Sequence, residues 1–239
     1  MKKSILFIFT ACFLFTTSCS DFLDEEHKTK YSSEYVFGTP EGLKLAVNAL
    51  YALQRYYAND TENATIFALE RGTDLAVTNG GTGNFYGIYD PNYLKPSASQ
   101  VGFMWRTMYQ IIGKANEIIA AAEDLEDTPS LRATVSEAKC FRAQSYFLLY
   151  RTFDRIWLNI QPTTAENVND PRDFHAASEK EVFDLIYEDL EYAITNLDWV
   201  SDEAGRFTQA AARHMKAKAA LWLKDWDTTL EQVEEIEKS

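Results

Sequence analysis

Apolar residues recur at helical spacing along most of the chain beyond residue 37. The first stripe consists of Leu43, Val47, Leu50 and Tyr57, which share one face of a helix. Thr39 followed by Pro40 is typical of a helix start, because a threonine hydroxyl accepts a bond from a free amide and proline suits the first helical position. The pattern therefore predicts a helix over residues 39–57.

Five further segments continue this pattern toward the C-terminus. They span residues 101–125, 128–153, 178–197, 205–226 and 228–239. Ser178 and Glu181 fit a capping box, in which each side chain bonds the backbone amide of the other residue. Thr208 is a further predicted cap. Apolar residues cover so much of the circumference of segment 128–153 that we expect it to be an inner helix.

No segment alternates apolar and polar residues as a strand would, so the sequence predicts an all-α fold. Small residues in segment 217–236 allow two helices to approach closely and resemble tetratricopeptide (TPR) repeats, whose stacked hairpins bury a continuous core. The exception is segment 71–100, which holds five of the ten glycines and two of the six prolines. We predict a long irregular loop there. Loops of that length are usually functional or disordered, and the aromatic residues of this one argue against simple disorder.

The N-terminus has the pattern of a secretory signal peptide. Lys2 and Lys3 give it a positive charge, and residues 5–15 form an apolar stretch too short for a permanent membrane span. Small and hydroxylated residues follow, and Cys19 comes directly after them. Cys12 is an alternative boundary, although it would leave a much shorter apolar stretch.

Charge and cysteine content exclude several classes of function. The formal net charge is −13 and the pI is about 4.7, and an acidic surface repels the phosphate backbone of nucleic acids. Three cysteines are too few for a disulfide framework, and no metal-ligand spacing joins them to the three histidines. We expect no metal, no cofactor and no catalytic residue, because the isolated histidines lack an accompanying nucleophile.

The tryptophans fall into two groups by position. Trp105, Trp222 and Trp226 lie within the periodic segments, so we predict that they pack between helices. Trp157 and Trp199 lie near predicted helix ends, where a buried and a surface role are equally compatible with the pattern.

Three residues of segment 128–153 are informative because that helix is predicted to be buried. Arg142 and Arg151 interrupt its apolar positions, so we predict that they form ion pairs or cap carbonyl groups. Cys140 fits a small buried residue.

Six segments follow one another in order along nearly the whole chain. They are CSDFLDEE, TPEGLKLAVNALYALQ, MWRTMYQIIGKANEII, SEAKCFRAQSYFLLYRTFDRIWL, EVFDLIYEDLEYAI and GRFTQAAARHMKAKAALWLKDW. Together they resemble the RagB/SusD family of nutrient-uptake lipoproteins. The resemblance implies signal-peptide cleavage, acylation of Cys19 and a surface-exposed position on the outer membrane. It also implies capture of glycans or similar nutrients, without an enzymatic step, for a SusC-like TonB-dependent transporter.

The resemblance divides the chain into three parts. These are a signal peptide at 1–18, a lipid-anchored leader at 19–38 and a SusD-like helical domain at 39–239. Family members are usually much longer, so we expect the chain to lack the C-terminal lobe that contributes much of their ligand surface. The sequence leaves open whether it is a fragment or a natural truncation.

The loop at 71–100 supplies the groups that sugar recognition needs. Aromatic faces pack against the apolar side of a sugar ring, and planar polar groups bond its hydroxyls. The candidate ligand-binding residues are Asp74, Asn79, Asn84, Tyr86, Tyr89 and Tyr93. Alternatively, the tyrosines are tucked under the loop and the Asn-Gly pairs are turns.

These observations predict a glycan-binding lipoprotein of an outer-membrane uptake complex. Two alternatives remain open from the sequence. One is an envelope-anchored helical scaffold for protein interactions without sugar binding, and the other is a lipoprotein glycoside hydrolase, whose two carboxyl groups no sequence pattern identifies.

Overall fold

Helices are the regular secondary structure of the residues that the structure describes, which are 31–59, 95, 99–171 and 174–238. The computed structural model thus confirms the all-α prediction. The helices are α2 (Ser33–Gly38), α3 (Pro40–Asn59), α5 (Ser99–Ala122), α6 (Pro129–Phe153), α7 (Glu179–Asn196), α8 (Gln209–Leu223) and α9 (Trp226–Glu237). The predicted loop at 71–100 lies outside the described residues, apart from Lys95 and the first two residues of α5.

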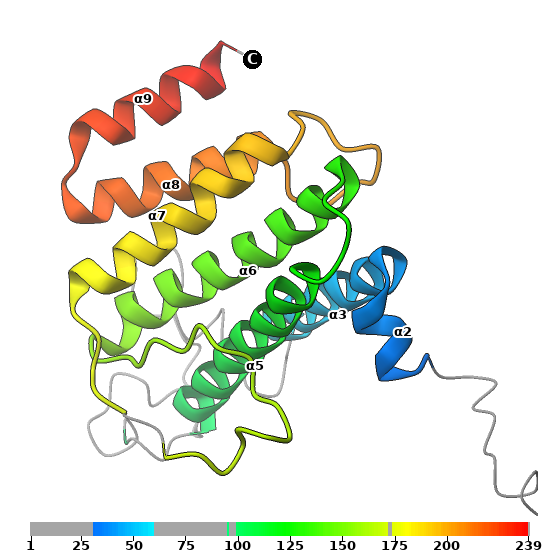
Figure 1. The fold of residues 1–239 in the computed structure, drawn as a ribbon. Helices are drawn as coiled ribbons and strands as arrows, with labels where there is room; N and C mark the ends of the chain where they lie inside the picture. Colours follow the sequence, from blue (N-terminus) through cyan, green and yellow to red (C-terminus); the bar gives the residue numbers. More distant parts are fainter. Residues whose placement is uncertain (1–30, 60–94, 96–98, 172–173, 239) are drawn as a thin grey trace, which may run out of the picture. The chain divides into compact units, whose positions relative to one another are not determined.

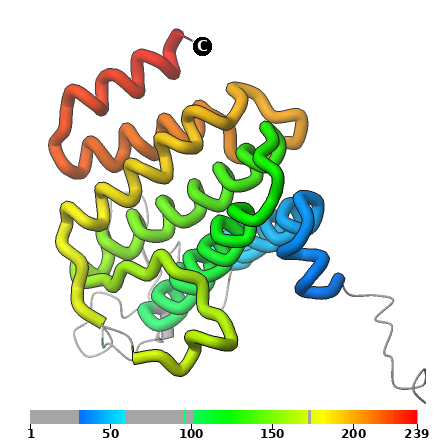
Figure 2. Tube along the Cα trace, in the orientation of Figure 1, coloured from blue at the N-terminus to red at the C-terminus, as the bar shows by residue number. Residues whose placement is uncertain are grey.

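Each long helix packs against the next one along the chain. Helix α3 contacts α5 and α6, α5 contacts α6, α6 contacts α7, α7 contacts α8, and α8 contacts α9 (Figure 1). The trace in Figure 2 follows the same succession from α5 in green to α9 in red. This stacking of neighbours in sequence is consistent with the predicted TPR-like repeats.

Helix α6 is the inner helix, as predicted. More than half of its positions are buried, and its largest fully buried side chains are Phe141, Tyr146 and Leu149. Cys140 is fully buried, as expected for a small apolar residue, and burial raises the pKa of its thiol. Helices α3, α5 and α7 turn their apolar stripes toward α6, and Leu43, Val47 and Leu50 of α3 have no exposed surface.

The predicted caps are confirmed. The Thr39 hydroxyl accepts a bond of 3.0 Å from the Gly42 amide, and the Thr208 hydroxyl accepts one from Ala211. Ser178 and Glu181 form both bonds of the capping box at the start of α7. These bonds satisfy amides that the first turn of a helix leaves free, so the sequence fixes where the helices begin.

The hairpin of α8 and α9 turns at a left-handed residue. Lys224 has φ 62°, and the Asp225 side chain then caps α9 by accepting a bond from the Thr228 amide. The prediction that Trp226 packs between helices is wrong. It is 57% exposed, because it is the first residue of α9 and lies directly after the turn.

Trp222 and Arg151 belong to one surface contact. Trp222 is 46% exposed and meets Phe147 edge to face, so it packs only partly between helices. The Arg151 guanidinium lies 5.4 Å from the centre of the Trp222 ring and 5.1 Å from that of Phe147. Arg151 thus makes cation–π contacts where we predicted an ion pair or a cap. None of the helices in the described part of the chain is long and apolar enough to cross a bilayer.

Candidate functional site

The residues proposed from the sequence as functional lie outside the described part of the chain. They are Cys19, the alternative Cys12, and the loop residues Asp74, Asn79, Asn84, Tyr86, Tyr89 and Tyr93. They therefore stay predictions. The described residues offer a different candidate, which follows α6.

A pocket of about 290 Å³ opens on the irregular segment between α6 and α7. Its lining includes Trp157, Asn159, Gln161, Asn167 and Asp170. The Asn167 side chain shapes one wall of the pocket, because it accepts a bond from the Thr164 amide and donates one to the Pro162 carbonyl. The Asn159, Gln161 and Asp170 side chains make no hydrogen bond within the described residues, so their polar groups are available to a ligand.

Four aromatic rings gather beside this pocket. The Trp157 ring lies 4.8 Å from that of Phe174 and 6.4 Å from that of Tyr109, with which it is stacked. Tyr109 in turn lies 4.8 Å from Trp105. Phe174 is 70% exposed, Trp105 is also exposed and Tyr109 is partly buried, so the cluster lies at the surface of the helical core. Such a cluster presents flat apolar faces beside polar side chains.

Two tyrosines, the buried Tyr146 and the partly buried Tyr109, hold the backbone of the pocket segment. The Tyr109 hydroxyl donates to the Trp157 carbonyl at 2.8 Å and accepts from the Trp157 amide at 2.9 Å. The Tyr146 hydroxyl does the same at Asn159, with both bonds at 2.8 Å. A phenol has one proton and free lone pairs, so each hydroxyl satisfies both backbone groups of one residue. The segment is thereby anchored at every second residue, as a strand would be by its neighbour.

The tyrosine hydroxyls keep their protons in this role. Burial raises the pKa of Tyr146 and that of Tyr109, although the backbone bond of each hydroxyl opposes the shift. Both hydroxyls therefore remain donors at neutral pH, and the position of the segment does not depend on a titration in that range.

Charge is sparse at the pocket. Asp170 is the one charged side chain among its lining residues, and the lining contains no lysine or arginine. Elsewhere in the described residues, no three His, Cys, Asp or Glu side chains gather in a way that could hold a metal ion. The pocket can thus stack and hydrogen-bond a neutral ligand, and its electrostatic attraction for an anion is poor.

A buried ion cluster lies deeper, between α6 and α7. Asp189 has no exposed surface, and its carboxylate accepts bonds of 2.7 and 2.8 Å from Arg142 and one of 2.8 Å from Lys139. The prediction that Arg142 forms an ion pair is confirmed. Bidentate geometry makes this a strong pair, and both charges would be costly to bury alone.

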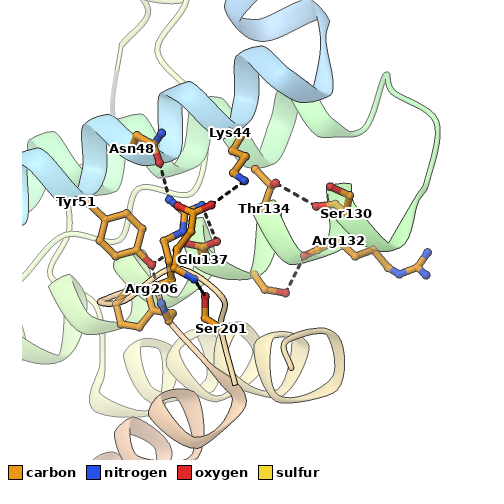
Figure 3. A network of polar contacts seen from close by, with 12 residues as sticks. Lys44, Asn48, Tyr51, Ser130, Arg132, Thr134, Glu137, Ser201 and Arg206 are labelled. Atoms are coloured by element: carbon orange, nitrogen blue, oxygen red, sulfur yellow. Dashed lines mark hydrogen bonds and ion pairs between the residues drawn. The ribbon is translucent and has the colours of Figure 1, made fainter. Parts of the chain in front are cut away.

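A second cleft, of about 380 Å³, lies between α3, α6 and the segment that joins α7 to α8. Glu137 is one of its lining residues and accepts bonds from Tyr51 at 2.5 Å and from Arg206 at 3.0 Å (Figure 3). Arg206 also bonds Asn48, and Lys44 pairs with Glu203 at 3.0 Å. Because these charges satisfy one another, the network serves to hold the joining segment against α3 and α6.

Burial has the largest effect on the pKa of the Glu137 carboxyl group. It raises the pKa of the carboxyl group, while the bonds from Tyr51 and Arg206 lower it. This balance is typical of a structural ion pair, so the aromatic pocket stays the better candidate for ligand binding.

Sequence reasoning missed most of this pocket. Trp157 was singled out only as a residue near a helix end, and Tyr109, Asn159 and Phe174 were not singled out. The available signal was the pair Tyr109 and Tyr146, each a hydroxyl among apolar helix positions, since a hydroxyl that is buried or partly buried needs a partner.

The fold and the pocket define a class: all-α repeat proteins with an aromatic, amide-lined surface site. Within this class, the chain belongs to the SusD-like family. The family model described as "Starch-binding associating with outer membrane" matches residues 21–221. The family resemblance predicted from the sequence is confirmed.

Relatives and solved structures agree with this assignment. A SusD-like protein of Bacteroides ovatus is 28% identical over 95% of this chain and 40% of its own length. SusD-like protein P38 of Formosa agariphila is 27% identical over 95% of this chain and 44% of its own length. The chain therefore spans about two fifths of the length of these curated relatives.

Among solved structures, a laminarin-binding SusD-like protein superimposes with a TM-score of 0.71 and 25% identity. The match covers 82% of this chain and 43% of that one. A SusD-like carbohydrate-binding protein of Bacteroides fragilis gives a TM-score of 0.68 with 18% identity, over 86% of this chain and 41% of that one, which shows the shared fold.

Proposed function

We propose that this protein is a cell-surface glycan-binding lipoprotein without an enzymatic step. It would work with a SusC-like TonB-dependent transporter in nutrient uptake at the outer membrane. The description of its family, which names starch binding and the outer membrane, supports this function. The laminarin-binding SusD-like protein of similar structure supports a carbohydrate ligand. The observation that carries the proposal is the pocket that Trp157 lines together with the amide-bearing residues Asn159 and Gln161.

The chemistry of the pocket suits a sugar ring. The apolar face of a pyranose packs on an aromatic ring, and its hydroxyls both donate to and accept from side-chain amides. We propose that Tyr86 and Tyr89 of the predicted loop also contact the ligand. That loop runs into α5, the helix that carries Trp105 and Tyr109 in its first three turns. The loop is thus attached at the helix end that bears aromatic residues of the pocket.

The ligand we favour is a neutral oligosaccharide. The pocket lining has a carboxylate and no cation, and the chain carries a formal net charge of −13. Sulfated or uronic glycans would meet repulsion at this surface, which weakens at high salt. We therefore expect laminarin oligosaccharides to bind and a sulfated glycan of equal length to bind much more weakly.

Exchange of Trp157 tests the pocket directly. Titration calorimetry with laminarin oligosaccharides would compare the full chain with Trp157→Ala and with a control, Trp226→Ala. We expect Trp157→Ala to weaken binding by about tenfold or more, since an aromatic stack contributes on the order of 1 kcal/mol beyond the area that it buries. Trp226→Ala should leave affinity unchanged, because Trp226 lies on the last helix. Equal affinity of both variants would contradict the assignment of the pocket.

The loop residues have their own test. Tyr86→Ala and Tyr89→Ala should each weaken the same titration if the predicted loop contributes to the site. Unchanged affinity in both variants would remove the loop from the proposal and leave the Trp157 pocket in place.

The lipid anchor is tested by mass. Cleavage before Cys19 and acylation of its thiol and amino group predict a mature chain that carries acyl mass, lost in Cys19→Ala. A mature chain without acyl mass on Cys19 would contradict membrane anchoring at this residue and would not affect the glycan site.

A second candidate function is a protein-interaction scaffold. The observation that favours it is a group of exposed apolar residues on the hairpin of α8 and α9. They are Leu221, Trp222, Trp226, Leu230 and Val233. Exposed apolar patches often mark protein contacts. Capture of the SusC-like transporter without retention on any polysaccharide would favour this candidate over glycan binding.

A further inference from the structure

We propose that Asn116 is a positioning residue for the candidate pocket. It connects the buried ion cluster to the backbone of the pocket segment and so holds Trp157 in place. We name the series Asp189, Arg142 and Asn116 the polar relay. Its consequence for ligand affinity rests on the proposed function, whereas its effect on Trp157 can be measured without a ligand.

Every link of the polar relay is short and buried. Arg142 donates two bonds to Asp189 and a third, of 2.8 Å, to the side-chain oxygen of Asn116. The Asn116 amide nitrogen then donates a bond of 2.7 Å to the Asn159 carbonyl. Asn116 is 1% exposed, Arg142 is 5% exposed and Asp189 is fully buried, so water does not compete for these bonds.

The relay needs a side chain at position 116 that both accepts and donates a hydrogen bond, as an amide does. A guanidinium has donors and no acceptor, and a carbonyl has an acceptor and no donor. A residue between them must accept on one side and donate on the other. Arg142 therefore fixes the orientation of the Asn116 amide, and the amide nitrogen necessarily faces Asn159.

Charge strengthens this orientation. The cluster contains two cations, Lys139 and Arg142, and one carboxylate, Asp189, all buried. The excess positive charge is met by oxygen atoms and by the Tyr192 ring, whose centre lies 5.2 Å from the Lys139 ammonium. The Asn116 side chain points its oxygen at the Arg142 guanidinium, and its amide nitrogen points toward the Asn159 carbonyl.

Asn159 lies two residues beyond Trp157 in the anchored segment. Its carbonyl accepts from both Asn116 and Tyr146, whereas the Trp157 backbone is held by Tyr109. Loss of the Asn116 donor would leave Tyr146 as the sole anchor of Asn159 among these side chains. The segment would then shift, and the Trp157 ring would shift with it.

The substitution Asn116→Asp removes the hydrogen-bond donor at position 116 and keeps the acceptor. Aspartate has nearly the same shape and still accepts from Arg142, but its ionised carboxylate cannot donate to the Asn159 carbonyl. If Asn116 only satisfied Arg142, this exchange would be tolerated. If it positions the segment, Trp157 must move. Lys139→Met is the matched control, because Lys139 binds the same Asp189 but makes no bond to Asn116 or Asn159.

Fluorine NMR of the full chain labelled with fluorotryptophan reads out the position of Trp157, whose signal is assigned with Trp157→Phe. We expect Asn116→Asp to shift and broaden the Trp157 signal while those of Trp222 and Trp226 stay fixed. Lys139→Met should lower stability without moving the Trp157 signal. An unchanged Trp157 signal in Asn116→Asp would overturn the proposal.

A measurement on the unaltered chain covers the case in which Asn116→Asp does not fold. The Asn116 side-chain amide protons should exchange slowly with deuterated water, because both bonds of the amide are buried. Exchange as fast as that of an exposed asparagine such as Asn169 would overturn the relay.

Affinity for laminarin oligosaccharides completes the test. We expect a loss of about fivefold or more in Asn116→Asp and none in Lys139→Met. A shifted Trp157 signal with unchanged affinity would support the relay and contradict the proposed site. Absence of binding in the unaltered chain would contradict the proposed ligand, while the fluorine signal still decides on the relay.

Discussion

The inner helices and the outer hairpin of this protein use similar residues in opposite ways. We call α3, α5, α6 and α7 the inner helices, and α8 with α9 the outer hairpin. The inner helices bury Leu50, Leu149 and Leu190 almost completely and enclose a satisfied ion cluster. The outer hairpin exposes Trp226 and Leu230 by more than half, and Gln232 is the one buried residue of α9.

This difference indicates where the stability of the described chain lies. Burial of apolar surface is the main favourable term in folding, so the inner helices should unfold together as one unit. Among the described helices, α9 packs mainly on α8, and it depends on its turn and its cap. We therefore expect the outer hairpin to open locally at a lower free energy than the rest.

The largest expected effect comes from the buried ion cluster. Arg142→Met should lower the free energy of unfolding by about 3–5 kcal/mol, because it leaves the Asp189 carboxylate buried with Lys139 as its remaining cation. Urea unfolding followed by circular dichroism measures this loss. The control is Lys180→Met, which removes an exposed pair with Asp184 and should cost about 0.5 kcal/mol or less. Equal losses in the two variants would contradict the importance of burial.

The same substitution, leucine to alanine, can be made in each of the two regions, so that the two sites differ in burial and not in the group removed. Leu149→Ala on α6 should cost about 2–5 kcal/mol, since it removes fully buried methyl groups and leaves a cavity. Leu230→Ala on α9 should change the free energy of unfolding by about 0.5 kcal/mol at most, because the side chain is 59% exposed. The same urea titration serves both. A large cost at Leu230 would mean that an unrecognised partner covers the outer hairpin.

Each region also contains a helix whose first turn is capped by a side chain, and removal of these two caps compares the regions again. Ser178→Ala removes the capping box of α7 and should lower the global free energy of unfolding by about 0.5–2 kcal/mol. Asp225→Ala removes the cap of α9, and we expect faster amide exchange confined to α9 with the urea midpoint unchanged. Hydrogen exchange followed residue by residue distinguishes the two outcomes. A global loss in Asp225→Ala would show that the hairpin unfolds with the inner helices.

Much of the fold follows from local signals in the sequence. Leu43, Val47 and Leu50 repeat at helical spacing, and Thr128 and Ser178 mark helix starts, because caps and periodicity depend on neighbouring residues only. The short helix α2 was not predicted, since its six residues carry no periodic stripe. Whether Trp226 would be covered could not be predicted either, because exposure depends on what packs beside a helix.

The candidate pocket shows the same limit more strongly. It depends on Tyr109, Asn116 and Tyr146 meeting an irregular segment some 13–48 residues away in the sequence. Such bonds between distant residues follow from tertiary packing and leave no spacing pattern. The sequence could predict that a buried arginine at position 142 needs a carboxylate, but not that Asp189 would supply it.

The smallest effect at neutral pH, and the most specific, is expected at Tyr57. Burial raises its pKa to about 12, and its hydroxyl has no hydrogen-bond partner in the described part of the chain. At neutral pH, Tyr57→Phe should therefore be nearly neutral, because no bond is lost. Above about pH 10 the unfolded chain loses the phenol proton while the folded chain keeps it, so the stability that the proton provides falls as pH rises toward the folded pKa.

The alkaline titration of tyrosine reports on the inner helices and not on the outer hairpin, because α8 and α9 contain no tyrosine. For Tyr57 alone, the free energy of unfolding should fall by about 1.4 kcal/mol for each pH unit between about 10 and about 12. Tyr57→Phe removes this contribution and should be clearly more stable than the unaltered chain at about pH 11, with no difference at about pH 8. Identical alkaline unfolding of Tyr57→Phe and the unaltered chain would mean that this phenol is solvated in the folded protein, and that the inner helices are less closed at the end of α3 than their packing indicates.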